Sequence, residues 1–234
     1  MQCRGNFHDP LVASSIPEIP GLYYIKNVLP NDQLDEITAE LAKETRWFSV
    51  GCGKQSRKVM HYDHKYNYGS TQRQTDPAPK LPEAFADLRI SLVATLEDIN
   101  REIDAVAVYS SRPAAHNNRI LTSEAIAREK FDQCIVNRYL PGQGIGAHID
   151  ALAYGSIVAC YTFSGGAYID FTGNRSWNEY TRREIWTEPN SLYIMTGSSR
   201  YDYKHAMVPR LTDKIGNNVI KRRERISITF RSVL

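Results

Sequence analysis

The last stretch of the chain alternates strictly between polar and apolar side chains. Residues 225–231 read Arg-Ile-Ser-Ile-Thr-Phe-Arg. Because alternate side chains of a β-strand share one face, the arginines and hydroxyls would lie together and the apolar side chains would lie opposite. The pattern predicts a strand that covers a core with one face and turns Arg225, Ser227, Thr229 and Arg231 toward a polar site.

Shorter alternating runs, separated by Gly, Pro and Asn turns, fill the rest of the second half of the chain. We expect strands near residues 21–28, 47–50, 133–139, 145–150, 156–163, 166–171, 183–187, 191–195 and 225–233. A helical period occurs instead at residues 30–43 and 81–100. Helices followed by many short strands predict an α+β fold whose second half is a double-stranded β-helix, a jelly-roll or cupin-like barrel.

Composition divides the chain into segments. Residues 1–20 are polar and rich in proline, which predicts a loosely held N-terminal arm followed by a single domain over residues 21–234, with its barrel core at 131–234. Residues 51–76 are rich in Gly, Lys, Arg, His and Tyr and nearly lack aliphatic side chains. This lid segment (residues 51–76) is therefore expected at the surface, as a hairpin or lid. Residues 104–123 give no readable fold.

Length, charge and cysteine content restrict the class of protein. A chain of 234 residues can bury a full core without disulfides, and its four cysteines form no C-x-x-C pair, which is typical of a reducing compartment. No leader and no apolar run near the ~20 residues of a membrane span is present, so we expect a cytoplasmic or nuclear protein without a membrane partner. A net charge of +3 is compatible with nucleic acid but does not identify it. We expect a monomer, although no pattern fixes the oligomeric state.

His148 and Asp150 follow the same two-residue period, so they would point the same way from one strand. Two histidines and a carboxylate with open positions make the facial triad of non-haem Fe(II) oxygenases, and His205, after a predicted strand, is the candidate for the third ligand. The guanidinium of Arg225 matches both oxygens of a carboxylate at once. Together these residues predict a 2-oxoglutarate-dependent Fe(II) dioxygenase that uses O2.

Four groups of residues resemble the motifs of the AlkB family of nucleic-acid dioxygenases. They are Asn137-x-Tyr139, His148-x-Asp150, His205-x-x-x-Pro209-Arg210 and Arg225-x-Ser227-x-Thr229-x-Arg231. The resemblance covers roughly residues 130–234. It implies an enzyme that oxidatively dealkylates or hydroxylates modified bases in RNA or DNA, with Fe(II), 2-oxoglutarate and O2.

The resemblance also implies a role for each site residue. The metal ligands would be His148, Asp150 and His205, and with Arg225 they would form the catalytic set. The 2-oxoglutarate site would be formed by Asn137, Tyr139, Arg225, Ser227 and Arg231. In this arrangement Arg225 pairs with the distal carboxylate, and Arg231 acts near the metal end.

Residues 210–213 and 221–223 resemble most closely the branch of the family that acts on the wobble uridine of tRNA, and residues 57–62 resemble the lid of that branch. The candidate substrate-binding residues of the lid segment are Arg57, His61, Tyr62 and Tyr66. Aromatic side chains there could stack on a base. The alternative is a tyrosine ladder that covers the edge of the barrel.

Other interpretations stay open. His61-Tyr62-Asp63 is a second His-x-Asp, but it lies in the lid segment without a downstream arginine clamp, so we expect a structural or substrate-facing role for it. A zinc site of Cys52, His61 and His64 matches no established spacing. Rival functions are a 2-oxoglutarate-dependent hydroxylase of a protein or small molecule, and a binding module without activity.

Overall fold

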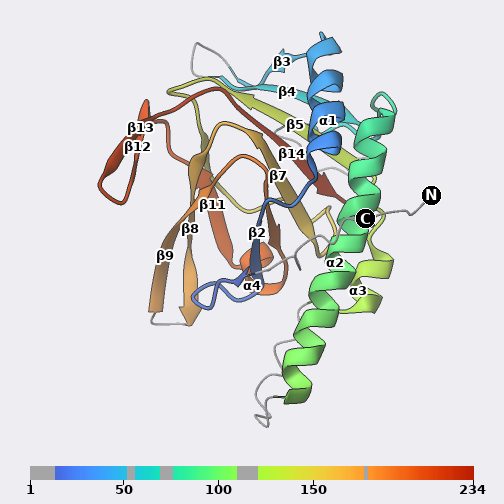
Figure 1. The fold of residues 1–234 in the computed structure, drawn as a ribbon, viewed down its shortest axis with the longest axis vertical. Helices are drawn as coiled ribbons and strands as arrows, with labels where there is room; N and C mark the ends of the chain where they lie inside the picture. Colours follow the sequence, from blue (N-terminus) through green and yellow to red (C-terminus); the bar gives the residue numbers. More distant parts are fainter. Residues whose placement is uncertain (1–13, 52–55, 69–75, 110–120, 177–178) are drawn as a thin grey trace, which may run out of the picture.

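Two antiparallel β-sheets of unequal size form the frame of the molecule (Figure 1). The computed structural model describes residues 14–51, 56–68, 76–109, 121–176 and 179–234. The helices are α1 (Asn31–Lys43), α2 (Glu83–Tyr109), α3 (Ser123–Arg128) and α4 (Gly197–Tyr201). The strands are β1 (Ser14–Ser15), β2 (Leu22–Lys26), β3 (Phe48–Ser49), β4 (Lys58–Tyr62), β5 (Gln133–Tyr139), β6 (Ile145–His148), β7 (Val158–Ser164), β8 (Ala167–Ser176), β9 (Glu179–Thr187), β10 (Ser191–Met195), β11 (Tyr203–Met207), β12 (Thr212–Ile215), β13 (Asn218–Lys221) and β14 (Arg225–Arg231).

The order of strands in the sheets brings distant parts of the chain together. The larger sheet has the order β1-β2-β10-β7-β14-β5-β4-β3, and the smaller has the order β6-β11-β8-β9. Strands β12 and β13 form a separate hairpin, which projects at the left of Figure 1. Two facing antiparallel sheets with long-range neighbours are the architecture of a double-stranded β-helix, so the predicted fold is confirmed.

The alternation along β14 divides its two faces as predicted. Ile228 and Phe230 belong to a core cluster that also contains Leu88, Leu92 and Leu96. These three leucines lie one helical turn apart on α2, so they form a single apolar stripe against the larger sheet. α2 and α1 thus cover the outer face of that sheet (Figure 1), and the polar face of β14 turns inward, toward the smaller sheet.

A second core cluster fills the space between the two sheets. Val158 and Tyr193 contribute from the larger sheet, and Ile169, Phe171 and Tyr203 contribute from the smaller one. This cluster holds the sheets together, so the side chains of both sheets can converge on one site. Among the described residues, no helix combines the length and the hydrophobicity needed to cross a membrane.

Two predicted boundaries change. Residues 14–20 are not a loose arm, because β1 pairs with β2 and the side chain of Ile19 is fully buried; residues 1–13 lie outside the described residues. α2 continues to Tyr109, so it includes the start of the segment at 104–123 that the sequence left without a fold. The rest of that segment, at 110–120, also lies outside the described residues.

The lid segment is only partly a surface element. Its residues 58–62 form β4, which pairs with β5 inside the larger sheet. Val59, Met60 and Tyr62 are buried there, so the expectation that this segment contributes nothing to a core is wrong for β4. The polar composition of the whole segment did not indicate the five-residue strand within it. Residues 52–55 and 69–75 lie outside the described residues.

Tyr62 is a core residue that also lines a second cavity, so its predicted contact with substrate stays a prediction. Its fully buried ring packs edge-on against Phe85 of α2, with centroids 5.5 Å apart. The guanidinium of Arg46 lies over the same ring, 5.3 Å from its centroid. These contacts hold the ring against α2 and leave little of its surface exposed.

Candidate active site

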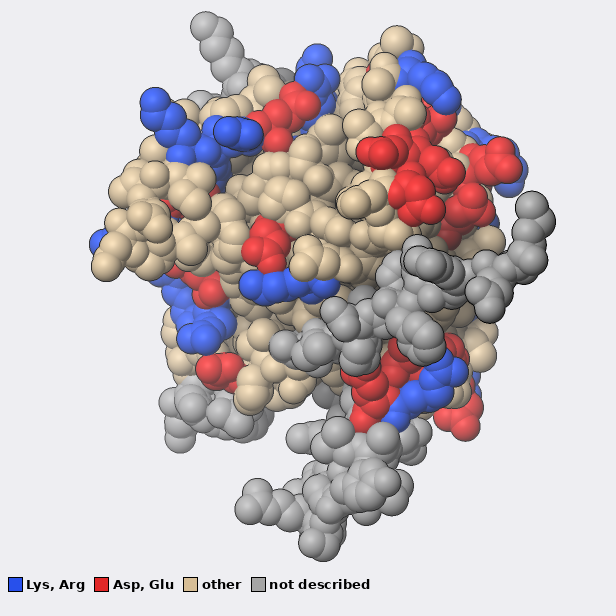
Figure 2. All heavy atoms as spheres, in the orientation of Figure 1, with Lys and Arg blue, Asp and Glu red and all other residues tan. Residues whose placement is uncertain are grey.

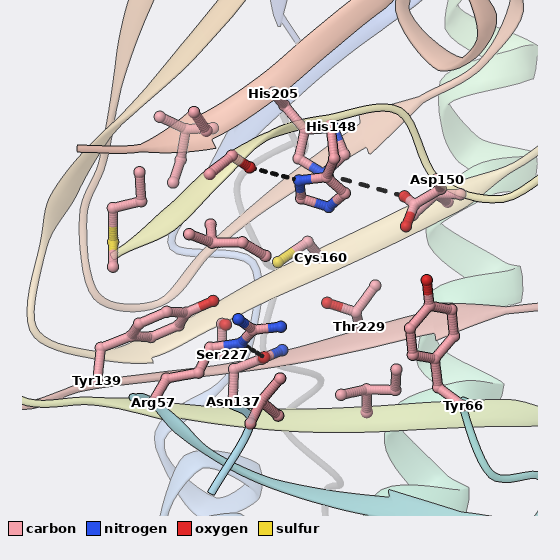
Figure 3. Close-up of a pocket in the computed structure, with 18 of the residues that line it drawn as sticks. Arg57, Tyr66, Asn137, Tyr139, His148, Asp150, Cys160, His205, Ser227 and Thr229 are labelled. Atoms are coloured by element: carbon pink, nitrogen blue, oxygen red, sulfur yellow. Dashed lines mark hydrogen bonds and ion pairs between the residues drawn. The ribbon is translucent and has the colours of Figure 1, made fainter. Parts of the chain in front are cut away.

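Three predicted metal ligands meet at the neighbouring strands β6 and β11 (Figure 3). His148 and His205 are direct partners in the register of these strands, and their rings lie 4.2 Å apart between centroids. Asp150 follows two residues after β6 ends, and its Oδ2 lies 3.9 Å from Nε2 of His205. One ligand atom from each residue lies within 4.8 Å of the others, which is the spacing of a metal site. It is the one such group found among the described residues.

Asp150 is held in place by two buried arginines. Nη1 of Arg231 donates to Oδ1 of Asp150 at 2.5 Å, and Nε of Arg231 donates to Gln133 at 2.9 Å. Arg200 donates to the backbone carbonyls of Asp150 and Ala151, each at 2.8 Å, and so fixes the loop after β6. Burial alone would raise the pKa of Asp150, but the charge of Arg231 and the two histidines outweigh it and lower that pKa to about 2. The carboxylate is therefore ionised and has Oδ2 free for a metal.

The surroundings of both histidines fit metal binding. Nδ1 of His148 lies 2.8 Å from the carbonyl oxygen of Gly146. A carbonyl only accepts, so Nδ1 carries a hydrogen and Nε2 is the ring nitrogen available to a metal. Burial lowers the pKa of His205 to about 4, although the charge of Asp150 opposes this. Neutral imidazole is the form that binds a metal, so all three side chains fit Fe(II).

The predicted 2-oxoglutarate residues converge in a cavity of about 320 Å³ that also contains the triad. In the register of β14 and β5, Arg225 lies opposite Tyr139 and Ser227 lies opposite Asn137. Arg225 is only 4% exposed, and its Nη2 donates to Thr162 at 2.8 Å. Its Nε has no hydrogen-bond partner among the described residues. A buried, unpaired guanidinium N–H is costly, so this end of the cavity fits a carboxylate.

Arg57 lies with the 2-oxoglutarate residues rather than on an outer surface. Its Nε donates to Oδ1 of Asn137 at 2.9 Å, and it lines the cavity beside Tyr139 and Ser227 (Figure 3). Since the amide oxygen of Asn137 faces the arginine, the amide N–H2 of that residue is left to donate to a ligand. The sequence predicted a substrate contact for Arg57, whereas its position allows contact with the co-substrate as well.

An aromatic wall closes the cavity on the side of the lid segment. Tyr66 and Tyr68 pack edge to face, 4.6 Å apart, and the guanidinium of Arg231 lies 5.4 Å from the ring centroid of Tyr66. His61 supports this wall, because its Nδ1 accepts from the backbone N–H of Tyr66 at 3.2 Å and its Nε2 lies 3.3 Å from the hydroxyl of Tyr68. His61 is 7% exposed, so it acts through the two tyrosines.

A second cavity, of about 420 Å³, lies on the other side of this wall. Tyr66 lines both cavities. Phe48 is 44% exposed at the second cavity and packs edge-on against His61, and Lys65 and Asn67 also line it. The two cavities therefore share one aromatic partition.

The second His-x-Asp motif belongs to no metal-ligating group of the described residues. Asp63 adopts a positive φ of 59°, and its carboxylate pairs with Arg89 at 3.3 Å. Nδ1 of His64 lies 2.7 Å from the carbonyl oxygen of Asp132. The side chains of this motif are thus used for packing and turn geometry, and Cys52, the third member of the zinc alternative, lies outside the described residues.

The three basic residues at 221–223 differ in their exposure to solvent. Arg222 is buried and forms two hydrogen bonds to Asp213, at 2.5 and 2.9 Å, so it closes the β12–β13 hairpin. Lys221 and Arg223 are exposed. Only these two of the three basic residues are available to a partner.

Three residues that orient the site were not found from the sequence. Thr162 of β7 positions Arg225, Gln133 of β5 positions Arg231, and Arg200 of α4 fixes the loop of Asp150. Gln133 could have been found, since it lies directly opposite Arg231 in the pairing of β5 and β14. Arg200 carries no sequence signal, because its role depends on a buried carbonyl cluster of distant residues.

The pKa of His61 predicts a pH-dependent stability. Burial, with the charges of Arg231, Arg57 and Lys65, lowers that pKa from its ordinary 6.5 to about 4. Between pH 6.5 and 4, His61 is therefore protonated in the unfolded chain but not in the folded protein. The folded protein consequently loses stability as the pH falls through this window. Urea unfolding at pH 7 and at pH 4.5 would measure how much the free energy of unfolding falls between the two. This fall should be smaller by about 2–3 kcal/mol in His61→Gln than in the unchanged protein. An equal loss in both proteins would contradict this.

Comparison with known proteins finds one family whose model matches most of the chain. The 2OG-Fe(II) oxygenase superfamily matches residues 21–231. "Uncharacterized protein L905" of Acanthamoeba polyphaga mimivirus is 38% identical over 112 residues, which are 47% of this chain and 52% of that protein. The mouse "tRNA (carboxymethyluridine(34)-5-O)-methyltransferase ALKBH8" is 25% identical over 92% of this chain and 30% of its own length. The Arabidopsis thaliana "Alkylated DNA repair protein ALKBH8 homolog" is 24% identical over 92% of this chain and 59% of its own length.

The chain thus spans between about a third and three fifths of these relatives. Solved structures share its fold. The structure of OsALKBH1 superposes with a TM-score of 0.65 at 17% identity and covers 94% of this chain and 100% of that chain. A Pseudomonas putida prolyl-4-hydroxylase superposes with a TM-score of 0.52 at 14% identity and covers 92% of this chain and 93% of that chain.

Proposed function

The chain belongs to the 2OG-Fe(II) oxygenase superfamily, and from this premise we propose that it oxidises a modified nucleobase in RNA or DNA. The predicted resemblance to the AlkB family is confirmed by its relatives, and the chain is a 2-oxoglutarate-dependent dioxygenase with Fe(II), 2-oxoglutarate and O2 as cofactor and co-substrates. The observation that carries the nucleobase proposal is the aromatic wall. Tyr66 and Tyr68 line the same cavity as the triad, so a flat base could stack beside the metal ligands.

One end of the cavity would bind the metal and the other would bind the co-substrate. His148, Asp150 and His205 would hold Fe(II), which supplies the activation of O2 and couples the decarboxylation of 2-oxoglutarate to oxidation of a C–H bond. Arg225 would neutralise the distal carboxylate of the co-substrate, and Asn137 on the adjacent strand would donate a hydrogen bond to the co-substrate. Arg231 keeps Asp150 ionised and in place. The buried walls exclude water and so strengthen these charge contacts.

The position of the oxidised carbon decides the product. A hydroxyl placed on a carbon attached to nitrogen gives an unstable hemiaminal that releases an aldehyde, which is dealkylation. A hydroxyl on a carbon attached to carbon stays, which is hydroxylation. The reacting base must enter the cavity, so a base in a duplex would have to be flipped and a base in a loop would have to be splayed outward.

The second cavity supports a polymeric substrate. It adjoins the main cavity through Tyr66, and it presents the exposed ring of Phe48 and the exposed side chain of Lys65. A nucleotide next to the reacting one could stack on this ring and place its phosphate near the lysine. On the face seen in Figure 2, basic side chains of the described residues form several separate groups. On that face the basic side chains of the described residues are therefore not joined into one continuous patch.

The names of the relatives suggest two substrates for the proposed reaction. One name refers to carboxymethyluridine 34 of tRNA and the other to alkylated DNA. The resemblance of residues 210–213 and 221–223 favours the first, with hydroxylation of the uridine side arm. A cytoplasmic or nuclear location and a monomeric state stay predictions.

Product analysis over a panel of substrates tests this function. The protein with Fe(II) and 2-oxoglutarate would be offered oligonucleotides with methylated adenine or cytosine, as DNA and as RNA, and a tRNA anticodon loop with a modified wobble uridine. We expect succinate together with either the loss of one methylene or the gain of one oxygen on a base, and neither change with His148→Ala. Succinate without any change in the nucleic acids would contradict the proposed substrate class and favour a protein or small-molecule substrate.

A further inference from the structure

The side chains that line the main cavity carry an excess of positive charge. Among the described residues its charged side chains are Arg57, Arg225, Arg231 and Asp150. A divalent metal ion and the dianion 2-oxoglutarate balance each other. A base that enters the loaded site therefore meets more arginine than carboxylate, in a partly enclosed space where charge acts strongly.

Arg57 contributes a positive charge that neither Asp150 nor the distal carboxylate of the co-substrate pairs. Arg231 is paired with Asp150 at 2.5 Å, and the unpaired Nε of Arg225 fits the distal carboxylate of the co-substrate. Arg57 has no ion pair with any described residue, and its one hydrogen bond in the cavity goes to the neutral amide of Asn137.

The field of Arg57 extends to both sides of the cavity. Arg57 lines the same cavity as Tyr139, on the co-substrate side, and Tyr68, on the aromatic wall, and its charge opposes the rise that burial causes in the pKa of both hydroxyls. Tyr68 is part of the surface on which the base would stack. Arg57 is thus close enough to act on the charge of the reacting base as well as on the co-substrate.

We propose that Arg57 is a specificity-determining residue that excludes bases with a fixed positive charge, so that the substrate is a neutral or anionic modified base. This inference rests on the proposed oxidation of nucleobases and narrows its substrate class. Bases methylated on a ring nitrogen that become cationic, such as 1-methyladenine and 3-methylcytosine, are poor substrates. Neutral methylated bases are accepted, and a base with a carboxylate on its side arm is favoured most.

Two methylated pyrimidines give a matched test. 3-Methylcytosine and 3-methyluracil carry the same methyl group on the same ring nitrogen, but only the first is cationic at neutral pH. We would place each in the same single-stranded RNA and measure turnover as kcat/KM and binding by fluorescence anisotropy. Binding would be measured with 2-oxoglutarate and Zn(II) in place of Fe(II), so that this readout does not depend on activity.

The unchanged protein should prefer 3-methyluracil by at least about ten-fold in both measurements, and Arg57→Gln should reduce this preference by about ten-fold. Arg57→Lys keeps the charge and should keep the preference. Lys58→Gln removes a neighbouring charge that is exposed and outside the cavity, so it should also leave the preference unchanged. A merely structural role of Arg57 would weaken both substrates equally and would not change their ratio.

Two results would overturn the inference in distinguishable ways. Equal preference for the two bases, or an unchanged ratio in Arg57→Gln, would refute selection by charge while the nucleobase function stands. Failure of every variant to bind either RNA, with succinate still released in the presence of Fe(II), would refute the nucleobase function and the charge selection with it.

Discussion

Replacing His205 with alanine should abolish succinate release and weaken the binding of Fe(II) by more than about 100-fold. The variant loses one of three ligands and leaves His148 and Asp150, which cannot form a facial triad by themselves. Anaerobic titration with Fe(II) and quantification of succinate with 2-oxoglutarate would measure both effects. Loss of activity with unchanged affinity for the metal would contradict the assignment of His205 as a ligand.

His205 is a cleaner test than Asp150. Removal of Asp150 would leave the buried guanidinium of Arg231 without its 2.5 Å partner, which costs about 3–5 kcal/mol of stability in comparable buried pairs. His205→Ala keeps that pair intact, so the protein should stay folded and the lost activity can be attributed to the metal. His61→Gln is the matched control, because it removes the histidine of the other His-x-Asp motif and should leave metal binding unchanged.

The period of two along the strands was enough to predict most of this site. It placed Arg225, Ser227 and Arg231 on one face of β14, and the structure turns that face toward the triad. Asp150 differs slightly, because β6 ends at His148 and the carboxylate is held by a loop instead of a strand. Local alternation determines which side chains share a face, and this is why the prediction succeeded.

Composition was a poorer guide than periodicity. The lid segment contains few aliphatic residues, yet β4 within it is an internal strand and Tyr62 is a core residue. Arg57 directly precedes this strand and donates a hydrogen bond to Asn137, 80 positions away in the sequence. Contacts of this kind depend on which strand pairs with β5, and a single sequence does not contain that information. Arg200 escaped prediction for the same reason, since its partners are backbone carbonyls of a distant loop.

Arg225→Met should weaken the binding of 2-oxoglutarate by about 100-fold, because the distal carboxylate would be buried without a cation. The same change should make the protein without co-substrate more stable. Arg225 is 4% exposed and its Nε has no partner, so the empty site holds a charge whose desolvation is only partly compensated by Thr162. Methionine removes that charge and fills a similar space, and we expect a gain of about 1 kcal/mol in the free energy of unfolding.

Opposite effects on stability and binding are what separate a co-substrate clamp from a structural arginine. Urea unfolding without 2-oxoglutarate would measure the gain in stability, and calorimetric titration of 2-oxoglutarate with Mn(II) would measure the loss of affinity. Arg225→Lys keeps the charge but not the planar fork, so its affinity should lie between those of the other two proteins. Arg223→Met, an exposed change two residues away, should alter neither quantity. If Arg225→Met lowered stability and left the affinity unchanged, Arg225 would be a structural residue. A residue that serves only to bind a ligand lowers the free energy of unfolding of the ligand-free protein, so its removal should raise that free energy.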